Sequence, residues 1–304
     1  MLFFKKRESK GCGRMELCIG TIQIGMQFGA FAKSRVEADK MLEYALSHGI
    51  RSFNTANAYD ELEKALAPFI KKADRKTLNI ITRIRPGALF SVAPEDYYKT
   101  LKQNIKRSLS NLGVREADGC LFHNGEYAQD EAALEALARL KSDRLTKKTG
   151  ISVSTPAQFD AVSHSPHVDI IQIPYNILDT RMDARLAKCK KEIHARNITL
   201  QGLLLLDESE VPRKLRDAQP IIHRLDSFCE FHGVSRLRVL LNFAKTQPRI
   251  GMVVFSPRDL TQLKQGIRDF EEDMDHTALR ELADEFAMTA QHIVEPSLWQ
   301  GEYR

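Results

Sequence analysis

Short apolar runs alternate with longer amphipathic stretches along the whole of this 304-residue chain. Eight of the runs are strand candidates, and several of these are nearly continuous in apolar residues, which is typical of parallel strands that helices cover from outside. The eight runs are MELCIG (15–20), GIRSFNTA (49–56), LNIITRI (78–84), ADGCLFH (117–123), TGISVS (149–154), VDIIQIPY (168–175), ITLQGLLL (198–205) and IGMVVFS (250–256).

The stretches between these runs carry the apolar period of helices. Residues 34–49 have one apolar face and end at Gly49, and similar patterns cover 94–113 and 130–142. The apolar face of the first stretch consists of Val36, Met41, Leu42, Ala45 and Leu46. Eight strand candidates that alternate with helices predict a (β/α)8 TIM barrel of the α/β class. A doubly wound sheet would need a G-x-G-x-x-G turn after its first strand, and none is present there.

We expect a single barrel domain over residues 1–304, because no low-complexity linker interrupts the alternation. Three segments are additional to the repeating strand–helix unit. Residues 1–15 are predicted to form a leader or hairpin, residues 206–247 an additional helical segment, and residues 275–304 a terminal helix and tail.

Composition excludes several classes of protein. The net charge is +5, but basic residues are interleaved with acidic ones, so no nucleic-acid footprint is indicated. Five cysteines without C-x-x-C spacing indicate neither a disulfide framework nor a zinc site, and His164 and His167 lack further metal ligands. No apolar run approaches the ~20 residues of a membrane span. We therefore expect a cytoplasmic protein with no nucleic-acid or membrane partner and no bound metal.

Polar residues gather where the predicted strands end. In a barrel of this kind the chemistry lies at the carboxyl ends of the strands, so these side chains should share one rim. The residues at the strand ends are Gly20, Thr21, Asn54, Tyr59, Thr82, Arg83, His123, Asn124, Ser152, Gln172, Tyr175, Gln201, Gly202, Ser256 and Arg258.

Taken in order along the chain, these segments resemble the aldo-keto reductase superfamily over nearly the full length. The segments that carry the resemblance are IGTIQIGMQFG, FNTANAY, IITR, DGCLFHN, GISVSTPAQFD, IIQIPYNILDTR, ITLQGLLLL and VVFSPRDLTQLKQ. Several of them look especially like a bacterial branch associated with surface-polysaccharide and sugar metabolism. Each motif is weak alone, but their number and order are specific.

The resemblance implies reduction of an aldehyde, ketone or sugar carbonyl by hydride from NADPH. By motif position Tyr59 corresponds to the general acid and His123 to the donor that orients the carbonyl. The family's lysine falls on Arg83 and its aspartate on Asn54. An acid and a donor are needed because the carbonyl oxygen gains negative charge as hydride arrives.

Two of these four catalytic positions depart from the family pattern. Arg83 keeps a positive charge but stays protonated, whereas Asn54 loses the negative charge. The pair therefore changes from neutral to about +1, which favours the tyrosinate form of Tyr59. Asp60 follows the tyrosine where the family has glycine. It is predicted either to cap the next helix in a box with Glu63 or to replace the missing anion.

The resemblance also assigns the cofactor NADP(H), with NAD(H) as an alternative. Ser152 and Gln172 are expected at the nicotinamide carboxamide, with the ring of Tyr175 stacked on the nicotinamide. The backbone near Gly202 is expected to pass the pyrophosphate, and the loop after the last strand to bind phosphate. The remaining expected cofactor residues are Gly20, Thr21, Gln201, Leu203, Ser256, Arg258, Gln262 and Gln265. The family's 2′-phosphate arginine falls on Gln262 and its adenine-contacting asparagine on Gly266, so Arg258 is the cation that could substitute.

Three functions remain open at this point. The leading one is an active NAD(P)H-dependent reductase with Tyr59 as general acid. The second is a nicotinamide-binding sensor or partner subunit that has lost turnover. The third is a barrel enzyme that uses Tyr59 as a base in elimination or isomerisation. The substrate is expected to be a small carbonyl compound or sugar, for which Trp299 offers either a stacking surface or simple packing of the tail. The sequence leaves the oligomeric state open.

Overall fold

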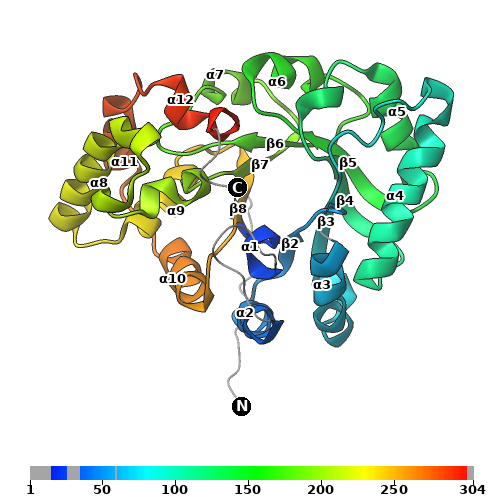
Figure 1. The fold of residues 1–304 in the computed structure, drawn as a ribbon, viewed down its shortest axis with the longest axis horizontal. Helices are drawn as coiled ribbons and strands as arrows, with labels where there is room; N and C mark the ends of the chain where they lie inside the picture. The colour runs from blue at the N-terminus through cyan, green and yellow to red at the C-terminus, as the bar shows by residue number, and fades with distance from the viewer. Residues whose placement is uncertain (1–14, 26–34, 59, 300–304) are drawn as a thin grey trace.

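The computed structural model describes residues 15–25, 35–58 and 60–299, and within them eight parallel strands form a closed barrel in sequential order (Figure 1). This confirms the predicted (β/α)8 fold. The strands are β1 (Glu16–Gly20), β2 (Ser52–Asn54), β3 (Asn79–Ile84), β4 (Ala117–Phe122), β5 (Thr146–Ser152), β6 (Ile170–Pro174), β7 (Glu192–Arg196) and β8 (Ile250–Phe255).

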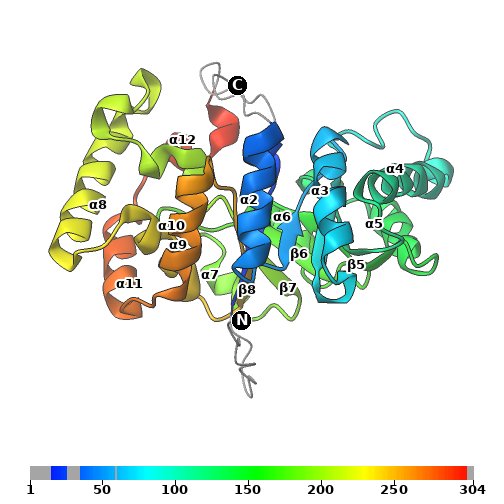
Figure 2. The same cartoon turned by 90° about the horizontal axis from the view of Figure 1, so that it is seen from below.

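Helices surround this barrel on its outside. Figures 1 and 2 show α8, α9 and α11 together on one side and α3, α4 and α5 on the other. The described helices are α1 (Ile22–Gly25), α2 (Arg35–Ser47), α3 (Asp60–Lys72), α4 (Tyr97–Leu112), α5 (Glu131–Ala138), α6 (Pro156–Val162), α7 (Asp183–Leu186), α8 (Gln219–His232), α9 (Arg236–Lys245), α10 (Leu260–Glu271), α11 (His276–Glu285) and α12 (Gln291–Val294). Gly49 follows α2 with a φ of 84°, as expected of a glycine that ends a helix.

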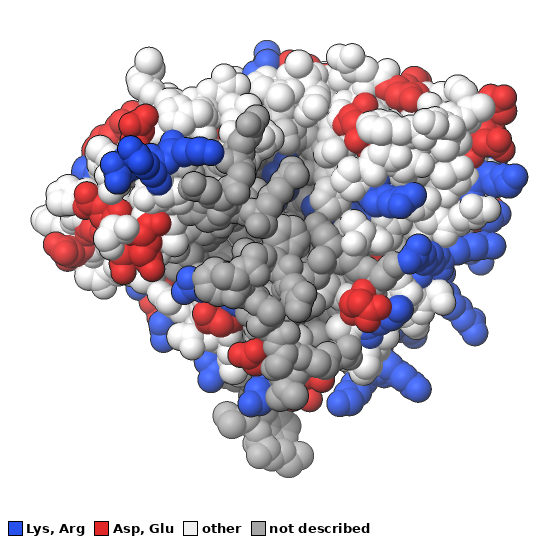
Figure 3. Space-filling view, in the orientation of Figure 1, with Lys and Arg blue, Asp and Glu red and all other residues white. Residues whose placement is uncertain are grey.

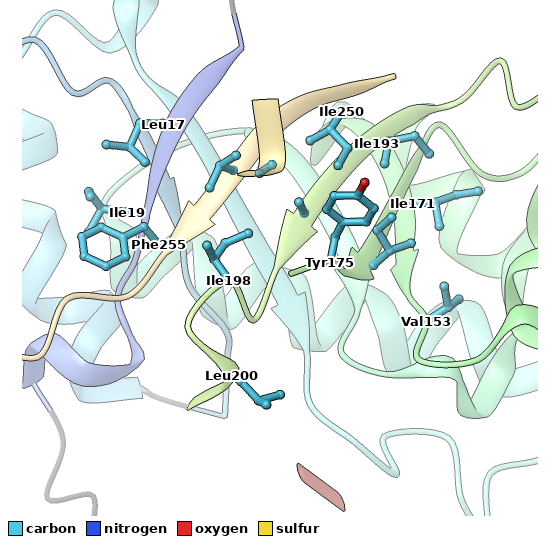
Figure 4. Packing of buried hydrophobic residues seen from close by; sticks show 14 of the residues in the cluster. Leu17, Ile19, Val153, Ile171, Tyr175, Ile193, Ile198, Leu200, Ile250 and Phe255 are labelled. Atoms are coloured by element: carbon cyan, nitrogen blue, oxygen red, sulfur yellow. The ribbon is translucent and has the colours of Figure 1, made fainter. Parts of the chain in front are cut away.

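Two separate apolar clusters divide the strands into an inner and an outer face. The inner cluster draws side chains from strands all around the barrel: Cys18, Ile81, Leu121, Ile170, Met252 and Val254. The larger cluster lies between the strands and the helices and includes Ile19, Ile171 and Phe255 (Figure 4). Because side chains alternate along a strand, a residue two positions beyond an inner-cluster residue also faces the barrel interior.

The seventh strand lies earlier in the chain than predicted. Residues 198–205 do not form it; β7 is Glu192–Arg196, and Leu200–Leu205 forms a 3-10 turn instead. The inward-facing positions of β7 are Glu192, His194 and Arg196, so this strand lacks an apolar run. Of these three only His194 is fully buried, and its Nε2 lies 2.8 Å from Glu192 Oε1, whose carboxylate also pairs with the half-exposed Lys148.

The surface carries both signs of charge. Figure 3 shows acidic and basic side chains interspersed over much of one face, with basic ones gathered over α3 and α4. Among the described helices, none is long and apolar enough to cross a membrane. No three His, Cys, Asp or Glu side chains within residues 15–25, 35–58 and 60–299 come together as a metal site.

Candidate active site

The interior rim at the carboxyl ends of the strands carries a ring of polar side chains. Arg83, His123 and Gln172 each lie two residues beyond an inner-cluster residue, so the alternation points all three inward. Strand pairing extends the ring, because Ser152 pairs with Gln172 and Asn54 pairs with Gly20. The inward rim positions are Gly20, Asn54, Arg83, His123, Ser152, Gln172, Arg196 and Ser256.

Gln172 is the most informative member of this ring. Its side chain is 0% exposed, yet neither Oε1 nor Nε2 has a hydrogen-bond partner among the described residues. Leaving a buried polar group unpaired costs about 1–3 kcal/mol, so native proteins rarely do so without a reason. A primary amide with a free donor and a free acceptor is complementary to another primary amide. The residue therefore fits the carboxamide of a nicotinamide, as its position predicts.

Arg196 holds the neighbouring Ser152 in place. Its Nε donates to Ser152 Oγ at 2.9 Å, and its second guanidinium nitrogen donates to Ser154 Oγ at 2.9 Å and to the Val153 carbonyl at 3.2 Å. The Ser152 hydroxyl accepts this bond and keeps its own hydrogen for a ligand. Arg196 is absent from the predicted site because the seventh strand is predicted too late in the chain. The period-two pattern of polar residues in EIHAR was the signal that could have found it.

His123 lies in a positively charged and largely dry part of the rim. Burial, Arg83 and Arg196 together lower the pKa of His123 to about 3. The imidazole is therefore neutral at physiological pH and can donate one N–H without acting as an acid. This state suits a donor that orients a carbonyl.

The neutral state of His123 should make the stability of the protein fall at acidic pH. Below its ordinary pKa of 6.5 His123 takes up a proton in the unfolded chain but not in the folded one, so its contribution to stability is lost as the pH falls from 6.5 toward 3. Between pH 6.5 and pH 4 we expect wild type to lose on the order of 3 kcal/mol more than His123→Gln. Urea denaturation at several pH values measures this, and parallel curves for the two proteins would contradict it.

Asn54 and Arg83 lie on adjacent strands and face the same interior. Asn54 is 2% exposed, and its Nδ2 is buried without a hydrogen-bond partner in the described part of the chain. Arg83 Nε donates to the carbonyl of Thr55 at 3.3 Å. The guanidinium thus contacts the backbone carbonyl of the residue that follows Asn54.

Two of the predicted features fall on parts of the chain that are not described. Tyr59 lies outside the described residues, as does the side chain of Asp60. Glu63, the expected partner of Asp60 in a capping box, is fully buried and accepts from Thr82 Oγ1 at 2.8 Å and from Asn111 Nδ2 at 3.2 Å. Its carboxylate therefore fixes α3 against β3 and α4.

Tyr175 does not reach the rim, in contrast to the sequence-based expectation. It lies an odd number of residues from Gln172 and so points outward, into the outer apolar cluster (Figure 4). There its ring stacks on Phe243 of α9 at a centroid distance of 5.6 Å. Its hydroxyl donates to Asp183 Oδ1 at 2.9 Å and accepts from Arg280 at 2.8 Å. Burial raises the pKa of Tyr175, so the hydroxyl stays protonated. The side chain packs the helical layer against β6.

Tyr175→Phe separates packing from cofactor binding. We expect the variant to lose about 1–2 kcal/mol of stability, because Asp183 and Arg280 each lose a buried partner. Its dissociation constant for a nicotinamide nucleotide should stay within about twofold of wild type. Chemical denaturation and fluorescence titration measure the two quantities. Cofactor binding weakened tenfold at unchanged stability would instead place the ring at the cofactor.

The loop after β7 is strained and uses its own backbone donors. Asn197, Leu200 and Gln201 have backbone φ values of 63°, 49° and 54°, which residues other than glycine rarely adopt. The N–H of Gln201 donates to Asn197 Oδ1 at 3.0 Å and that of Gly202 to the Thr199 carbonyl at 3.0 Å. The expected use of backbone N–H groups near Gly202 for pyrophosphate is therefore not supported. Leu203 is buried in the core, whereas the side chain of Gln201 is exposed and accessible to a ligand.

The loop after β8 combines one cation with one anion. Asp259 caps α10 by accepting from the Gln262 N–H at 2.7 Å, while Gln262 Oε1 accepts from the Arg258 N–H at 2.6 Å. Arg258 is exposed, and its Nε lies 3.5 Å from Asp259 Oδ2. A phosphate at this helix start would meet Arg258 and also the Asp259 carboxylate, whereas Gln265 lies half-buried farther along α10.

Two glycines, Gly20 at the end of β1 and Gly266 in α10, lie close to neighbouring side chains. A Cβ on Gly20 would lie 2.1 Å from Ser256 Oγ, and one on Gly266 would lie 2.3 Å from the ring of Phe255. A side chain at position 266 would therefore require the ring of Phe255 to move. Thr21, which follows Gly20, is buried, and its hydroxyl has no hydrogen-bond partner among the described residues. It joins Asn54 and Gln172 as a buried polar group near the rim without a partner among the described residues.

Three solved structures of similar fold are aldo-keto reductases. The holo form of an aldo-keto reductase from Bacillus halodurans has a TM-score of 0.74 and 19% identity, covering 92% of this chain and 95% of its own. An aldo/keto reductase from Klebsiella pneumoniae in complex with NADP and acetate has a TM-score of 0.69 and 13% identity, covering 92% and 94%. A thermostable aldo-keto reductase in complex with the inhibitor epalrestat has a TM-score of 0.70 and 20% identity, covering 88% and 94%. At these identities the likeness shows the fold alone.

The closed barrel is the fold that these aldo-keto reductases share. The model of the aldo/keto reductase family matches residues 16–284, so the chain belongs to that family, whose cofactor is NADP(H). No curated protein matches the chain by sequence.

Proposed function

We propose that this protein is an NAD(P)H-dependent reductase that acts on an aldehyde, a ketone or the carbonyl form of a sugar. The observation that carries the proposal is the buried Gln172 amide, whose donor and acceptor are both unpaired among the described residues. A site with this complementarity, at the catalytic rim of a barrel of this family, fits a nicotinamide carboxamide.

The bound cofactor would supply the hydride. Ser152 and Gln172 would hold the carboxamide and so fix which face of the ring points to the substrate. His123, neutral at working pH, would donate its N–H to the substrate carbonyl and orient it. Tyr59 would give its proton to the oxygen as negative charge develops there. The positive charge of Arg83 would ease that transfer by favouring the tyrosinate, with Asn54 positioning Arg83.

A second function is favoured by one observation, the absence of a carboxylate at Asn54. Arg83 contacts the Thr55 carbonyl instead, so the rim has changed both members of the family's charged pair. A nicotinamide-binding protein without turnover would tolerate this change. A tyrosinate base for elimination or isomerisation would be favoured by it, because the added positive charge lowers the pKa of a nearby tyrosine.

We also propose NADP(H) as the preferred cofactor and the cytoplasm as its location. Arg258 is the cation available to a 2′-phosphate, and Asp259 beside it weakens the preference over NAD(H). The described cysteines Cys18, Cys120, Cys189 and Cys229 are free and buried, which fits a reducing compartment. Sugar metabolism remains the proposed setting of the substrate.

Titration of the purified protein with NADPH and NADH tests this proposal, followed through the fluorescence of the reduced nicotinamide. Tight binding of at least one of them is expected, together with turnover of some members of a panel of simple aldehydes and aldose sugars. Failure of both nucleotides to bind would rule out the reductase and the binding protein alike.

A further inference from the structure

Arg196 places an uncompensated positive charge beside the proposed carboxamide site. Its guanidinium contacts two hydroxyls and one carbonyl, and no carboxylate of a described residue lies within 4.0 Å of it. Asp179, the acid whose charge raises the pKa of Arg196, already forms bonds of 2.8 and 2.9 Å with Arg181. Burial and the neighbouring Arg83 lower the pKa of Arg196 to about 10, so the side chain remains charged at neutral pH.

The two redox forms of a nicotinamide differ mainly in the charge of the ring. The oxidised ring carries one positive charge and the reduced ring none, while the ribose, phosphates and adenine are the same. A fixed cation in a desolvated rim repels the oxidised ring and leaves the reduced ring unaffected. Arg196 is one hydrogen bond away from Ser152, which pairs in register with Gln172. Its charge therefore lies next to the place where the ring would sit.

We propose that Arg196 makes this site select the reduced cofactor, by destabilising the oxidised ring electrostatically. The inference rests on the proposed function in so far as that function requires a nicotinamide at Ser152 and Gln172. Wild type should bind the reduced nucleotide at least about tenfold more tightly than the oxidised one, and each tenfold corresponds to a rise of ~30 mV in the potential of the bound couple. Because the oxidised nucleotide binds more weakly, it should also be released rapidly after the reaction.

The ratio of two dissociation constants tests the proposal without turnover. Calorimetric titration of wild type, Arg196→Gln and Arg196→Lys with NADPH and NADP⁺ gives the ratio for each protein, and thermal melts confirm that each is folded. Because the phosphates and adenine cancel in the ratio, it isolates the charge of the ring. We expect a ratio of about ten or more in wild type, a ratio near one in Arg196→Gln, and a largely retained ratio in Arg196→Lys.

Three results would overturn it. Equal affinity of wild type for the two forms would show that the rim does not discriminate, whatever the variants do. Equal weakening of both forms in Arg196→Gln would assign the guanidinium to the phosphates instead of the ring. Unchanged affinity of Arg196→Gln for both forms would remove Arg196 from the cofactor site. If wild type binds neither form, the proposed function fails with it, whereas the three results above leave nicotinamide binding intact.

Discussion

Tyr59→Phe is expected to lower kcat for aldehyde reduction by about 1,000-fold while leaving the dissociation constant for NADPH within about twofold of wild type. The ring is retained, and only the proton that neutralises the developing alkoxide is lost. Without that proton the oxygen keeps its charge, and His123, whose pKa is lowered to about 3, has no spare proton to give at neutral pH. Steady-state kinetics and fluorescence titration on the same preparation measure both quantities.

The Asn54→Asp/Arg83→Lys variant serves as the companion to this experiment. It restores the charged pair of the family and leaves Tyr59 untouched. Turnover slower than wild type would indicate that Asn54 and Arg83 form a retuned, active site, which is the expected result. Turnover that appears only in this variant would favour a lapsed enzyme. Activity that survives Tyr59→Phe would assign the proton transfer to another group.

Gln172→Leu is expected to weaken binding of NADPH and NADH by about 100-fold and, at the same time, to stabilise the protein without cofactor. Two hydrogen bonds to the carboxamide are lost, each worth about 1–1.5 kcal/mol, and 1.4 kcal/mol corresponds to a factor of ten. The same change removes a buried amide whose two polar atoms have no partner among the described residues, a burden of about 1–3 kcal/mol. Fluorescence titration and urea denaturation of the free protein measure the two effects.

Ile170→Val is the matched control on the same strand and the same inward face. It removes one methylene from the inner cluster and should cost about 0.5–1.5 kcal/mol of stability with unchanged cofactor affinity. Lost affinity together with gained stability is the signature of a residue kept for a ligand. Unchanged affinity in Gln172→Leu would place the nicotinamide elsewhere.

The barrel and most of its inward rim were predictable because two periodicities determine them. Parallel strands that helices cover are apolar throughout, so β3, β4, β6 and β8 stand out from the helical stretches. Within such a strand, the alternation of side chains carries Arg83, His123 and Gln172 inward once the strand ends are known. For these residues the alternation of side chains along a strand determines both the sequence pattern and the position in the barrel.

The departures have physical reasons as well. β7 turns three polar side chains inward, where Lys148 and His194 pair with Glu192, and a search for apolar runs passes over it. Tyr175 was assigned to the cofactor although the alternation points it outward to Phe243. The N–H of Gly202 donates to the Thr199 carbonyl. This hydrogen bond depends on the positive φ values of the loop and not on residue types.

The central claim is that this rim transfers hydride from a nicotinamide to a carbonyl. Reaction of the protein with NADPH carrying deuterium at both C4 positions, in the presence of an aldehyde that it turns over or a panel of aldehydes and aldoses, tests the claim by mass spectrometry of the products. The account predicts an alcohol that has gained one deuterium on the former carbonyl carbon, with none formed by Tyr59→Phe above about one part in a thousand of the wild-type rate. Tight NADPH binding with no deuterated alcohol from any substrate would contradict it.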